Sequence, residues 1–245
     1  MLRRISVRAL LVGGLLLTWS AAAPHVAAAS APAALPMQSA GAAVAGPVLR
    51  LVEAPVFRLQ VPFRTQKDGS RWQTSNCGPA TLGMLLDGFG IADQATDDLR
   101  LRAHTYQGTV GMRTGTGLDH VAHVADDLGL TTYGLFDPDG AFHHWSVPEI
   151  TAHLRDGHPV MPLVRLYLVP GYEGLAPRWG HYILLTGLAP DGSYFSDPLK
   201  TDPLAGTTGV ISERQLTAAI ENSHIPGQAV AYSGPRPLDV WLPDR

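Results

Sequence analysis

Residues 71–86 read RWQTSNCGPATLGMLL and contain Cys77, the only cysteine among the 245 residues. After Cys77 the apolar residues follow one another almost without interruption up to Phe89, which predicts a helix that is buried on most sides. Asn76 stands where an N-cap is favoured, and Pro79 stands where a first-turn proline is tolerated. The thiol is therefore expected at the N-terminus of a buried helix.

Cys77 allows two interpretations. Free cysteine is among the most buried residue types, which favours a structural thiol. At a helix N-terminus, however, the unpaired backbone N–H groups and the positive end of the helix dipole favour the thiolate. Gly78 has no side chain, so a substrate could approach the sulfur closely. A nucleophilic thiol also needs a base, and the base needs a third group that orients it.

The first residues of the chain indicate export. Arg3, Arg4 and Arg8 precede an apolar segment of about fifteen residues, and small residues before Ser30 offer a cleavage site. A membrane-spanning helix needs about twenty apolar residues, so we predict a secretory signal peptide over residues 1–29. The expected location is secreted or at the cell surface, with no stable membrane association after cleavage.

Composition limits the other function classes. Hydrophobic residues make up 45% of the chain and charged residues 16%, which permits a large core. A lone cysteine forms no intramolecular disulfide, so the fold depends on that core. Removal of residues 1–29 takes away three arginines and no acid, and the formal net charge changes from −3 to −6. An acidic protein is a poor partner for nucleic acid. We expect a monomer.

The remaining sequence predicts one domain of α+β class. Residues 30–55 are rich in Ala and Pro and read as a flexible linker, residues 56–235 as the domain, and residues 236–245 as a Pro-rich tail that packs loosely. Beyond the helix at Cys77, periodicity predicts four more helices. The first three of them precede most of the predicted strands, and the fourth lies between the last two strands. The helices span 94–104, 117–128, 147–156 and 211–221; the strands span 159–168, 181–188, 193–197 and 228–232, with a short strand from Val56 at the start. Helices first and antiparallel strands later favour α+β over alternating βαβ units.

Histidines are the candidates for the base. Most of the ten lie on predicted helices or in turns, where surface or core histidines are usual. His120 and His123 are three residues apart, but no Cys or carboxylate completes a ligand set, so we expect no metal and no cofactor. His181 differs, because it opens the strand WGHYILLTG directly after Gly180, which leaves space around the ring.

Asp197 is the candidate for the third group. The strand of His181 turns at Ala189-Pro190-Asp191-Gly192 and returns as SYFSDP. If Thr186 pairs with Tyr194, Asp197 lies on the same face of the hairpin as His181, within diagonal reach. A shift of one residue would turn Asp197 to the opposite face. The geometry permits a Cys–His–Asp set without requiring it.

Three segments together resemble a known family. VPFRTQKDGSRWQTSNCGPATLGMLL, WSVPEITAHLRDGHPVMPLVRLYLVPG and GHYILLTGLAPDGSYFSDP are similar to the bacteriocin-leader-peptidase-like, or double-glycine peptidase-like, branch of the papain-like cysteine peptidases. The resemblance covers residues 56–232 and implies the papain-like α+β fold. In that family the Cys of an N/D-C-G motif begins a helix, the His lies in a G-H-Y/F strand and the Asp of a D-P pair closes the next strand. Cys77, His181 and Asp197 match these positions.

The resemblance also implies a mechanism and the residues that stabilise the oxyanion. Cys77 attacks an amide carbonyl, His181 transfers protons and Asp197 holds the ring, with an acyl-thioenzyme as intermediate. The oxyanion is bound by the Cys77 backbone N–H and by a Gln upstream. The processing peptidases place this Gln six residues before the Cys, where this chain has Arg71. Gln66 in VPFRTQ is our choice for the role, with Gln73 as the second candidate.

Substrate contacts are less specified. Gly78, Trp179 and Gly180 are the expected substrate-binding residues. Trp145, Trp179 and Tyr172 could line a groove, although aromatic side chains more often pack in a core. The loop 169–180 could cover the site or only connect two elements.

Three functions remain open from the sequence. The first is a thiol hydrolase that acts on peptide bonds of extracellular proteins, cell-wall peptides or small secreted peptides. The best-known relatives cut leader peptides after Gly-Gly while fused to a membrane exporter, which this sequence does not contain. The second is acyl transfer to an amine, as in transglutaminase-like proteins. The third is a catalytically silent peptide-binding module of the same fold.

Overall fold

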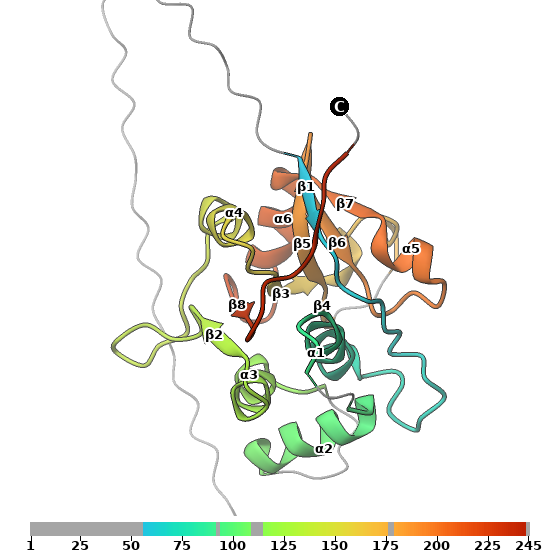
Figure 1. Ribbon diagram of the computed structural model, residues 1–245, viewed down its shortest axis with the longest axis vertical. Helices are drawn as coiled ribbons and strands as arrows, with labels where there is room; N and C mark the ends of the chain where they lie inside the picture. The colour runs from blue at the N-terminus through green and yellow to red at the C-terminus, as the bar shows by residue number, and fades with distance from the viewer. Residues whose placement is uncertain (1–55, 92–93, 109–114, 176–178, 244–245) are drawn as a thin grey trace, which may run out of the picture. The chain divides into compact units, whose positions relative to one another are not determined.

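The computed structural model describes residues 56–91, 94–108, 115–175 and 179–243 (Figure 1). The predicted signal peptide and linker lie outside these ranges. Helices are α1 (Cys77–Gly88), α2 (Thr96–Gln107), α3 (Leu118–Asp127), α4 (Val147–Arg155), α5 (Pro203–Thr207) and α6 (Glu213–Glu221), with a 3₁₀ turn at Leu166–Leu168. Strands are β1 (Phe57–Leu59), β2 (Thr131–Tyr133), β3 (Val160–Arg165), β4 (Gly180–Tyr182), β5 (Leu184–Ala189), β6 (Gly192–Ser196), β7 (Gly209–Ile211), β8 (Ala229–Ser233) and β9 (Val240–Trp241).

The strands form one antiparallel sheet. Along its main path the order is β2-β8-β3-β5-β1-β9, while β4 pairs with β3, and β6 pairs with β5 and β7. Every pairing among the described strands is antiparallel. The predicted α+β class is confirmed, with three helices before most of the sheet in sequence.

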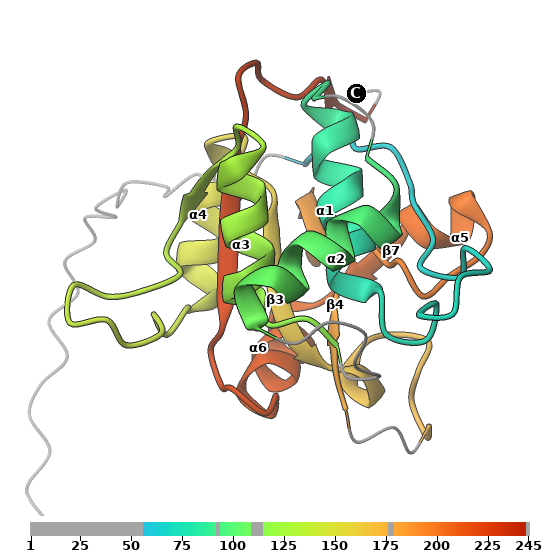
Figure 2. The same cartoon turned by 90° about the horizontal axis from the view of Figure 1, so that it is seen from below.

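Five of the six helices in the described residues lie in two groups. α1, α2 and α3 pack on one another, and through α1 and α3 they reach β4, β2 and β8. α4 and α6 pack against β3 and β5 and lie apart from the first group in Figure 1, whereas α3 and α4 overlap in the view of Figure 2. The core lies between these helices and the sheet and includes most residues of α1.

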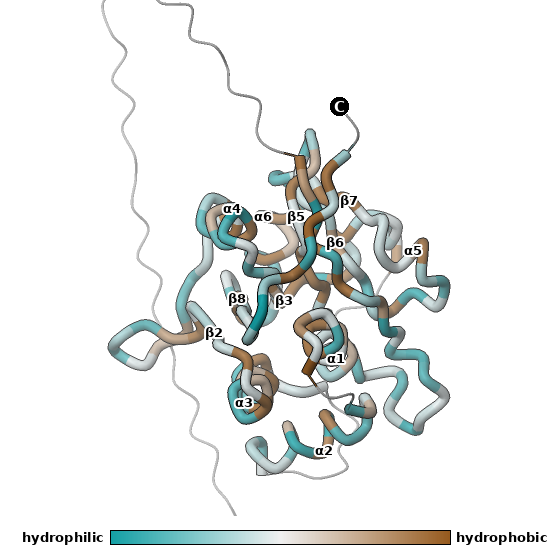
Figure 3. Tube along the Cα trace, viewed as in Figure 1, coloured by the Kyte–Doolittle hydropathy of each residue, from teal (hydrophilic) through white to brown (hydrophobic). Residues whose placement is uncertain are grey.

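Helix α1 is buried as its composition predicts. Its residues from Gly78 to Leu86 are all buried, and it ends at Gly88, close to Gly90 in the left-handed region at φ 66°. Figure 3 shows mostly apolar colours on α1 and mostly hydrophilic colours on α2, which covers it. A helix fixed on this many sides holds its first residue, Cys77, in a defined position.

The β5–β6 hairpin departs from the predicted pairing at one place. Gly187, not Thr186, pairs with Tyr194, whereas Leu185 pairs with Phe195 in the predicted register. A bulge between Leu185 and Gly187 absorbs the extra residue. Bulges insert one unpaired residue and thereby shift the register of the strand that follows.

The end of the chain also differs from the expectation of a loosely packed tail. Val240 and Trp241 form β9 and pair with β1 at the edge of the sheet. The short elements β2, α5 and β7 were not predicted either. Each has five residues or fewer, too few for a hydrophobic period to be recognised.

Candidate active site

His181 and Asp197 are joined by a hydrogen bond. His181 is the middle residue of β4, and Asp197 directly follows β6. Nε2 of His181 lies 2.8 Å from Oδ1 of Asp197, and both side chains are buried. The two residues therefore lie on the same face of the hairpin, as the predicted register required.

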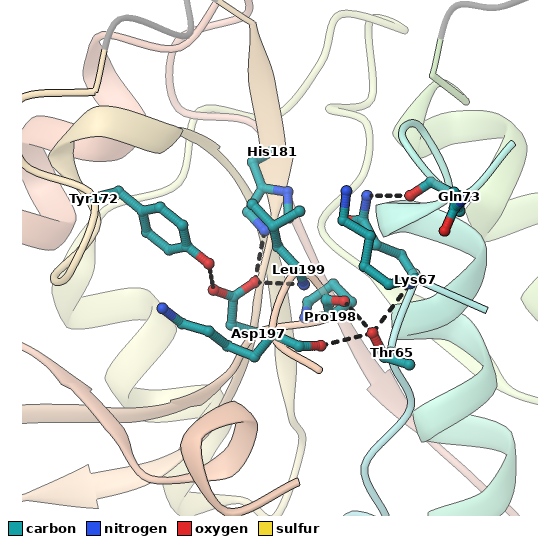
Figure 4. A network of polar contacts seen from close by, with 10 residues as sticks. Thr65, Lys67, Gln73, Tyr172, His181, Asp197, Pro198 and Leu199 are labelled. Atoms are coloured by element: carbon teal, nitrogen blue, oxygen red, sulfur yellow. Dashed lines mark hydrogen bonds and ion pairs between the residues drawn. The ribbon is translucent and has the colours of Figure 1, made fainter. Parts of the chain in front are cut away.

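Three donors hold the Asp197 carboxylate (Figure 4). Besides His181, the backbone N–H of Leu199 donates to Oδ1 at 2.9 Å, and the hydroxyl of Tyr172 donates to Oδ2 at 2.6 Å. Burial by itself would raise the pKa of Asp197, but the hydrogen bonds from His181, Tyr172 and Leu199 and the charge of His181 lower it below its ordinary value. Asp197 is thus a fixed carboxylate in a buried site.

Cys77 lies close to His181. The thiol is partly buried at the first position of α1, and Cys77 and His181 shift the pKa of each other. Since Nε2 contacts Asp197, Nδ1 is the ring nitrogen left for the thiol. The arrangement brings the three predicted residues together.

The charges of the three groups support one another. Burial would raise the pKa of the Cys77 thiol, but His181 and the backbone N–H groups of Tyr182 and Gly78 lower it below the ordinary value. Burial would lower the pKa of His181, but Asp197 and Cys77 raise it to about 9. Both shifts act in favour of a thiolate beside an imidazolium.

Asn76 does not cap α1, contrary to the sequence expectation. It occupies the N-cap position, but its side chain makes no capping hydrogen bond. Its Nδ2 donates instead to Asp97 at 3.1 Å, and its Oδ1 accepts from Arg100 at 2.9 Å. Arg100 also donates to the backbone oxygen of Ser75 at 3.0 Å. The segment before Cys77 is therefore fastened to α2.

The two candidate glutamines contact each other. Gln66 is buried, its backbone N–H donates to Pro198 at 2.7 Å, and its Nε2 donates to the backbone oxygen of Gln73 at 2.9 Å. Because Pro198 follows Asp197, Gln66 is attached to the side of the site that carries the carboxylate. The side chain of Gln73 is only half-buried. Gln66 is the one that is held both by its backbone N–H and by its carboxamide nitrogen.

A pocket of about 280 Å³ has Cys77, Trp179 and Gly180 among its lining residues. Gly78 is not: it is buried, and a side chain there would press against Thr116. Gly180 similarly leaves room for His224, whose ring would lie 2.7 Å from an added Cβ. The small residues on both sides of the site thus permit close packing.

Trp145, Tyr172 and Trp179 have different surroundings. Trp145 is buried in the core and donates to the backbone oxygen of Gly134 at 2.5 Å. Tyr172 is buried with its hydroxyl on Asp197, a role that its sequence context does not suggest. Trp179 is 68% exposed at the pocket. Only Trp179 is in a position to contact a ligand directly.

The described residues contain neither a metal cluster nor a membrane-spanning helix. Among them, no group of three or more His, Cys, Asp or Glu side chains is arranged to hold a metal ion. None of the helices in the same ranges is long and apolar enough to cross a bilayer.

Comparisons with known proteins agree with the sequence resemblance. The model of the Peptidase_C39 like family matches residues 58–215. No curated protein matches the chain. Among solved structures, the chain is similar to a C39-like peptidase from Bacillus anthracis, with 16% identity, 74% of this chain and 98% of that chain covered, and a TM-score of 0.48.

Two more solved structures are similar at the same level. One is a double glycine motif protease from an AMS/PCAT transporter in complex with the leader peptide, with 16% identity, coverage of 72% and 94%, and a TM-score of 0.47. The other is the peptidase domain of Streptococcus ComA, a bifunctional ABC transporter, with 18% identity, coverage of 72% and 100%, and a TM-score of 0.43.

Proposed function

Because the chain belongs to the Peptidase_C39 like family, we propose that it is an exported thiol hydrolase that cleaves peptide bonds with Cys77, His181 and Asp197. The observation that carries this proposal is the buried 2.8 Å contact between His181 and Asp197, next to a Cys77 that shifts the pKa of His181 and is shifted by it. A nucleophile, a base in contact with it and a group that orients the base are the three parts that acyl transfer requires.

The first half of the reaction uses the ion pair of Cys77 and His181. The thiolate sulfur bonds to the carbonyl carbon of the substrate, and the carbonyl electron pair moves to the oxygen. When the tetrahedral oxyanion collapses, the C–N bond breaks and the imidazolium gives its proton to the leaving amine. The products are a free amine and an acyl-thioenzyme on Cys77.

The second half returns the enzyme to its starting state. His181, now neutral, takes a proton from a water molecule as the water oxygen attacks the thioester carbonyl. The C–S bond then breaks, the acid leaves and the thiolate–imidazolium pair forms again. Asp197 remains ionised throughout and keeps the ring in one orientation through its 2.8 Å hydrogen bond.

The oxyanion is assigned two donors. One is the backbone N–H of Cys77 at the start of α1, where the helix dipole adds positive potential. The other is the carboxamide of Gln66. A carboxamide nitrogen carries two hydrogens, and the backbone oxygen of Gln73 engages one of them, which leaves the second for the substrate.

The substrate is assigned to the peptides and proteins outside the cell. Residues 1–29 support export, and the expected mature N-terminus after cleavage is Ser30. N-terminal sequencing of the protein recovered from outside the producing cells tests this part. An uncleaved N-terminus, or protein found only in the cytoplasm, would contradict it.

Cleavage is tested by profiling a complex peptide mixture with the mature protein and with its Cys77→Ala variant. New termini are expected with the wild type alone, while both proteins show the same melting curve. Identical peptide patterns from the two proteins would contradict a hydrolase. An added amine nucleophile separates acyl transfer from hydrolysis, because transfer incorporates the amine into the product.

Alkylation of Cys77 distinguishes a hydrolase from a silent binding module of the same fold. An activated thiolate reacts with iodoacetamide quickly at neutral and at mildly acidic pH. An ordinary thiol reacts slowly, and its reaction decreases further as the pH falls. The second behaviour would favour the binding module.

A further inference from the structure

The pocket beside Cys77 is built from several separate parts of the chain. Its walls come from the start of α1, the segment that leads into α3, the strands β3 and β4, and the turn between α6 and β8. Leu118, Leu163 and Ile225 make it largely apolar. A volume of about 280 Å³ accommodates one side chain or a short stretch of backbone.

Two polar side chains in this pocket have no hydrogen-bond partner among the described residues. Gln228 is 2% exposed, and neither its Oε1 nor its Nε2 is bonded. Thr116 is 4% exposed, and its hydroxyl is likewise unbonded. Buried polar atoms in folded proteins almost always have partners, so two unpaired groups in one pocket indicate a ligand that supplies them.

Both residues are fixed through their backbones. Gln228 accepts a 2.9 Å hydrogen bond from the N–H of Leu163 through its backbone oxygen, and Thr116 accepts one of 3.1 Å from the hydroxyl of Tyr182. The Thr116 hydroxyl also lies against Gly78, the residue after the nucleophile. The unpaired groups are therefore held next to the site of the reaction.

The charges around the pocket select against an acidic ligand. The carboxylate of Asp119 lies in its wall, 3.4 Å from His120. His224, also in the wall, has a pKa lowered by burial and by the nearby charge of Arg165, which keeps the ring neutral. A ligand that both donates to and accepts from Gln228 without carrying charge fits this environment.

We propose that this pocket is a substrate subsite that binds an amide group of the peptide, with Gln228 as the main specificity-determining residue and Thr116 as its helper. The amide of Gln228 offers one acceptor and a donor, and another amide presents the complementary pair. The inference rests on the proposed peptidase function, since it identifies which part of a peptide lies beside Cys77.

Two parts of a peptide carry an amide. One is the side chain of an Asn or Gln residue near the cleaved bond, and the other is a main-chain peptide unit. The first predicts a preference for Asn or Gln at one substrate position. The second predicts no side-chain preference but a requirement for one unmodified N–H in the backbone.

The test uses peptides based on a sequence that the mature protein cleaves. At each of the two positions on either side of the cleaved bond, Gln and Asn are compared with Met, Leu, Glu and Lys, and a parallel set carries single N-methylated peptide bonds. We expect one position or one peptide bond to change kcat/KM by at least about tenfold, because a site built for a hydrogen bond discriminates against ligands that lack it.

Three variants test which residues cause the dependence of kcat/KM on the substrate amide. Gln228→Leu is expected to remove the preference while Leu-containing peptides are still cleaved, and Thr116→Val to reduce it. Tyr232→Phe is the matched control, because the Tyr232 hydroxyl is also buried and unbonded among the described residues but does not line the pocket. We expect this control to retain the wild-type preference.

Stability gives a second readout. If the Gln228 amide is unpaired in the free protein, Gln228→Leu removes a buried polar group without breaking a bond, so the melting temperature stays level or rises by about 2–4 °C. A purely structural glutamine would instead lower the melting temperature when replaced, with the peptide preference unchanged. That result would overturn the proposal.

The remaining outcomes separate the subsite from the peptidase function. Cleavage with no amide dependence, or with a Lys preference that persists in Gln228→Leu, overturns the subsite and leaves the hydrolase intact. If no peptide is cleaved, binding to the Cys77→Ala variant decides. Binding that favours the amide peptides and disappears in Cys77→Ala/Gln228→Leu supports the subsite without catalysis, and equal binding of all peptides overturns it.

Discussion

The hydroxyl of Tyr172 donates a hydrogen bond of 2.6 Å to Oδ2 of Asp197, whose Oδ1 lies 2.8 Å from Nε2 of His181. With the Leu199 N–H on Oδ1 as well, both carboxylate oxygens are engaged by buried groups. Lys200 lies over the Tyr172 ring, with Nζ 4.3 Å from its centroid, and restricts the ring from one side. Tyr172 therefore acts through Asp197 as a positioning residue for the imidazole.

Replacement of Tyr172 by Phe tests this role. The variant leaves Oδ2 of a buried carboxylate without its donor, so we expect kcat/KM to fall by about tenfold with KM little changed. The pKa of Asp197 should rise, because one of the hydrogen bonds that lower it is lost. The acidic limb of the pH–rate profile then moves to higher pH. The measurement is kcat/KM against pH for both proteins.

Tyr167→Phe is the control for Tyr172→Phe. Tyr167 lies five residues earlier in the same segment and its side chain is 38% exposed. We expect its replacement to leave rate and pH profile unchanged. Equal losses in the two variants would mean that the segment, and not the hydrogen bond to Asp197, determines the rate.

The pKa shifts at Cys77 and His181 predict a broad pH optimum. The thiolate forms at a lower pH than an ordinary thiolate, so activity and alkylation should persist on the acidic side of neutrality. His181 keeps its proton until the pH approaches about 9, and above that value it cannot protonate the leaving amine. The rate is therefore expected to decrease on the alkaline side near pH 9.

NMR titration of the His181 ring measures the same quantity directly. In Cys77→Ala the pKa of His181 should fall below that of the wild type, because the contact with Cys77 is one cause of its increase, while Asp197 continues to raise it. An unchanged His181 pKa in Cys77→Ala would show that the thiol and the ring are not coupled.

The sequence was sufficient to predict the family, the α+β papain-like fold and the three residues Cys77, His181 and Asp197, which lie close together. Cys77 could be placed because the apolar run after it has no other location than a core. The pairing that brings Asp197 to the face of His181 was predicted near the site, where Leu184 pairs with Ser196. The predicted pairing was wrong between the bulge and the turn, where Gly187 and not Thr186 pairs with Tyr194.

The bulge explains why a local argument was only partly sufficient. From the turn outward, Ala189 pairs with Gly192 and Gly187 with Tyr194, a register that would turn Asp197 away from His181 if it continued. The extra residue at Thr186 shifts the register by one and restores the shared face. No feature of the sequence marks that position, because bulges depend on contacts across the sheet.

The residues that support or line the site were harder to recognise, because their roles also depend on contacts that are distant in sequence. Tyr172, Thr116 and Gln228 belong to no local motif and meet the site only through long-range packing. Asn76 was assigned as a cap because its position is typical of one, but a buried contact with Arg100 competes for the same side chain. In each case, contacts with residues that are distant in sequence determine what the side chain does.

Gln66→Ala tests the assignment of the oxyanion donor. If its carboxamide stabilises the developing charge, we expect kcat to fall by about a hundredfold with little change in KM. Gln73→Ala retains the backbone oxygen that holds Gln66 and should reduce kcat far less. Steady-state rates of both variants on the same peptide are compared. A larger loss in Gln73→Ala would reverse the assignment.

Arg100→Met tests how the segment before Cys77 is fastened. Arg100 is fully buried and donates to the backbone oxygen and the hydroxyl of Ser75, each at 3.0 Å, and to Oδ1 of Asn76. Methionine fills much of the volume but leaves those acceptors unpaired. We therefore expect the free energy of unfolding to decrease by about 2–4 kcal/mol. Urea denaturation measures it.

The reactivity of Cys77 should respond to the same change. Because the fastened segment leads directly into α1, alkylation of Cys77 in the folded Arg100→Met protein should slow, while the far-ultraviolet spectrum stays that of the wild type. Arg102→Met, an exposed position on the same helix, is the control and should change stability by no more than about 0.5 kcal/mol. If Arg100→Met loses stability with an unchanged alkylation rate, then Arg100 supports the fold without positioning Cys77.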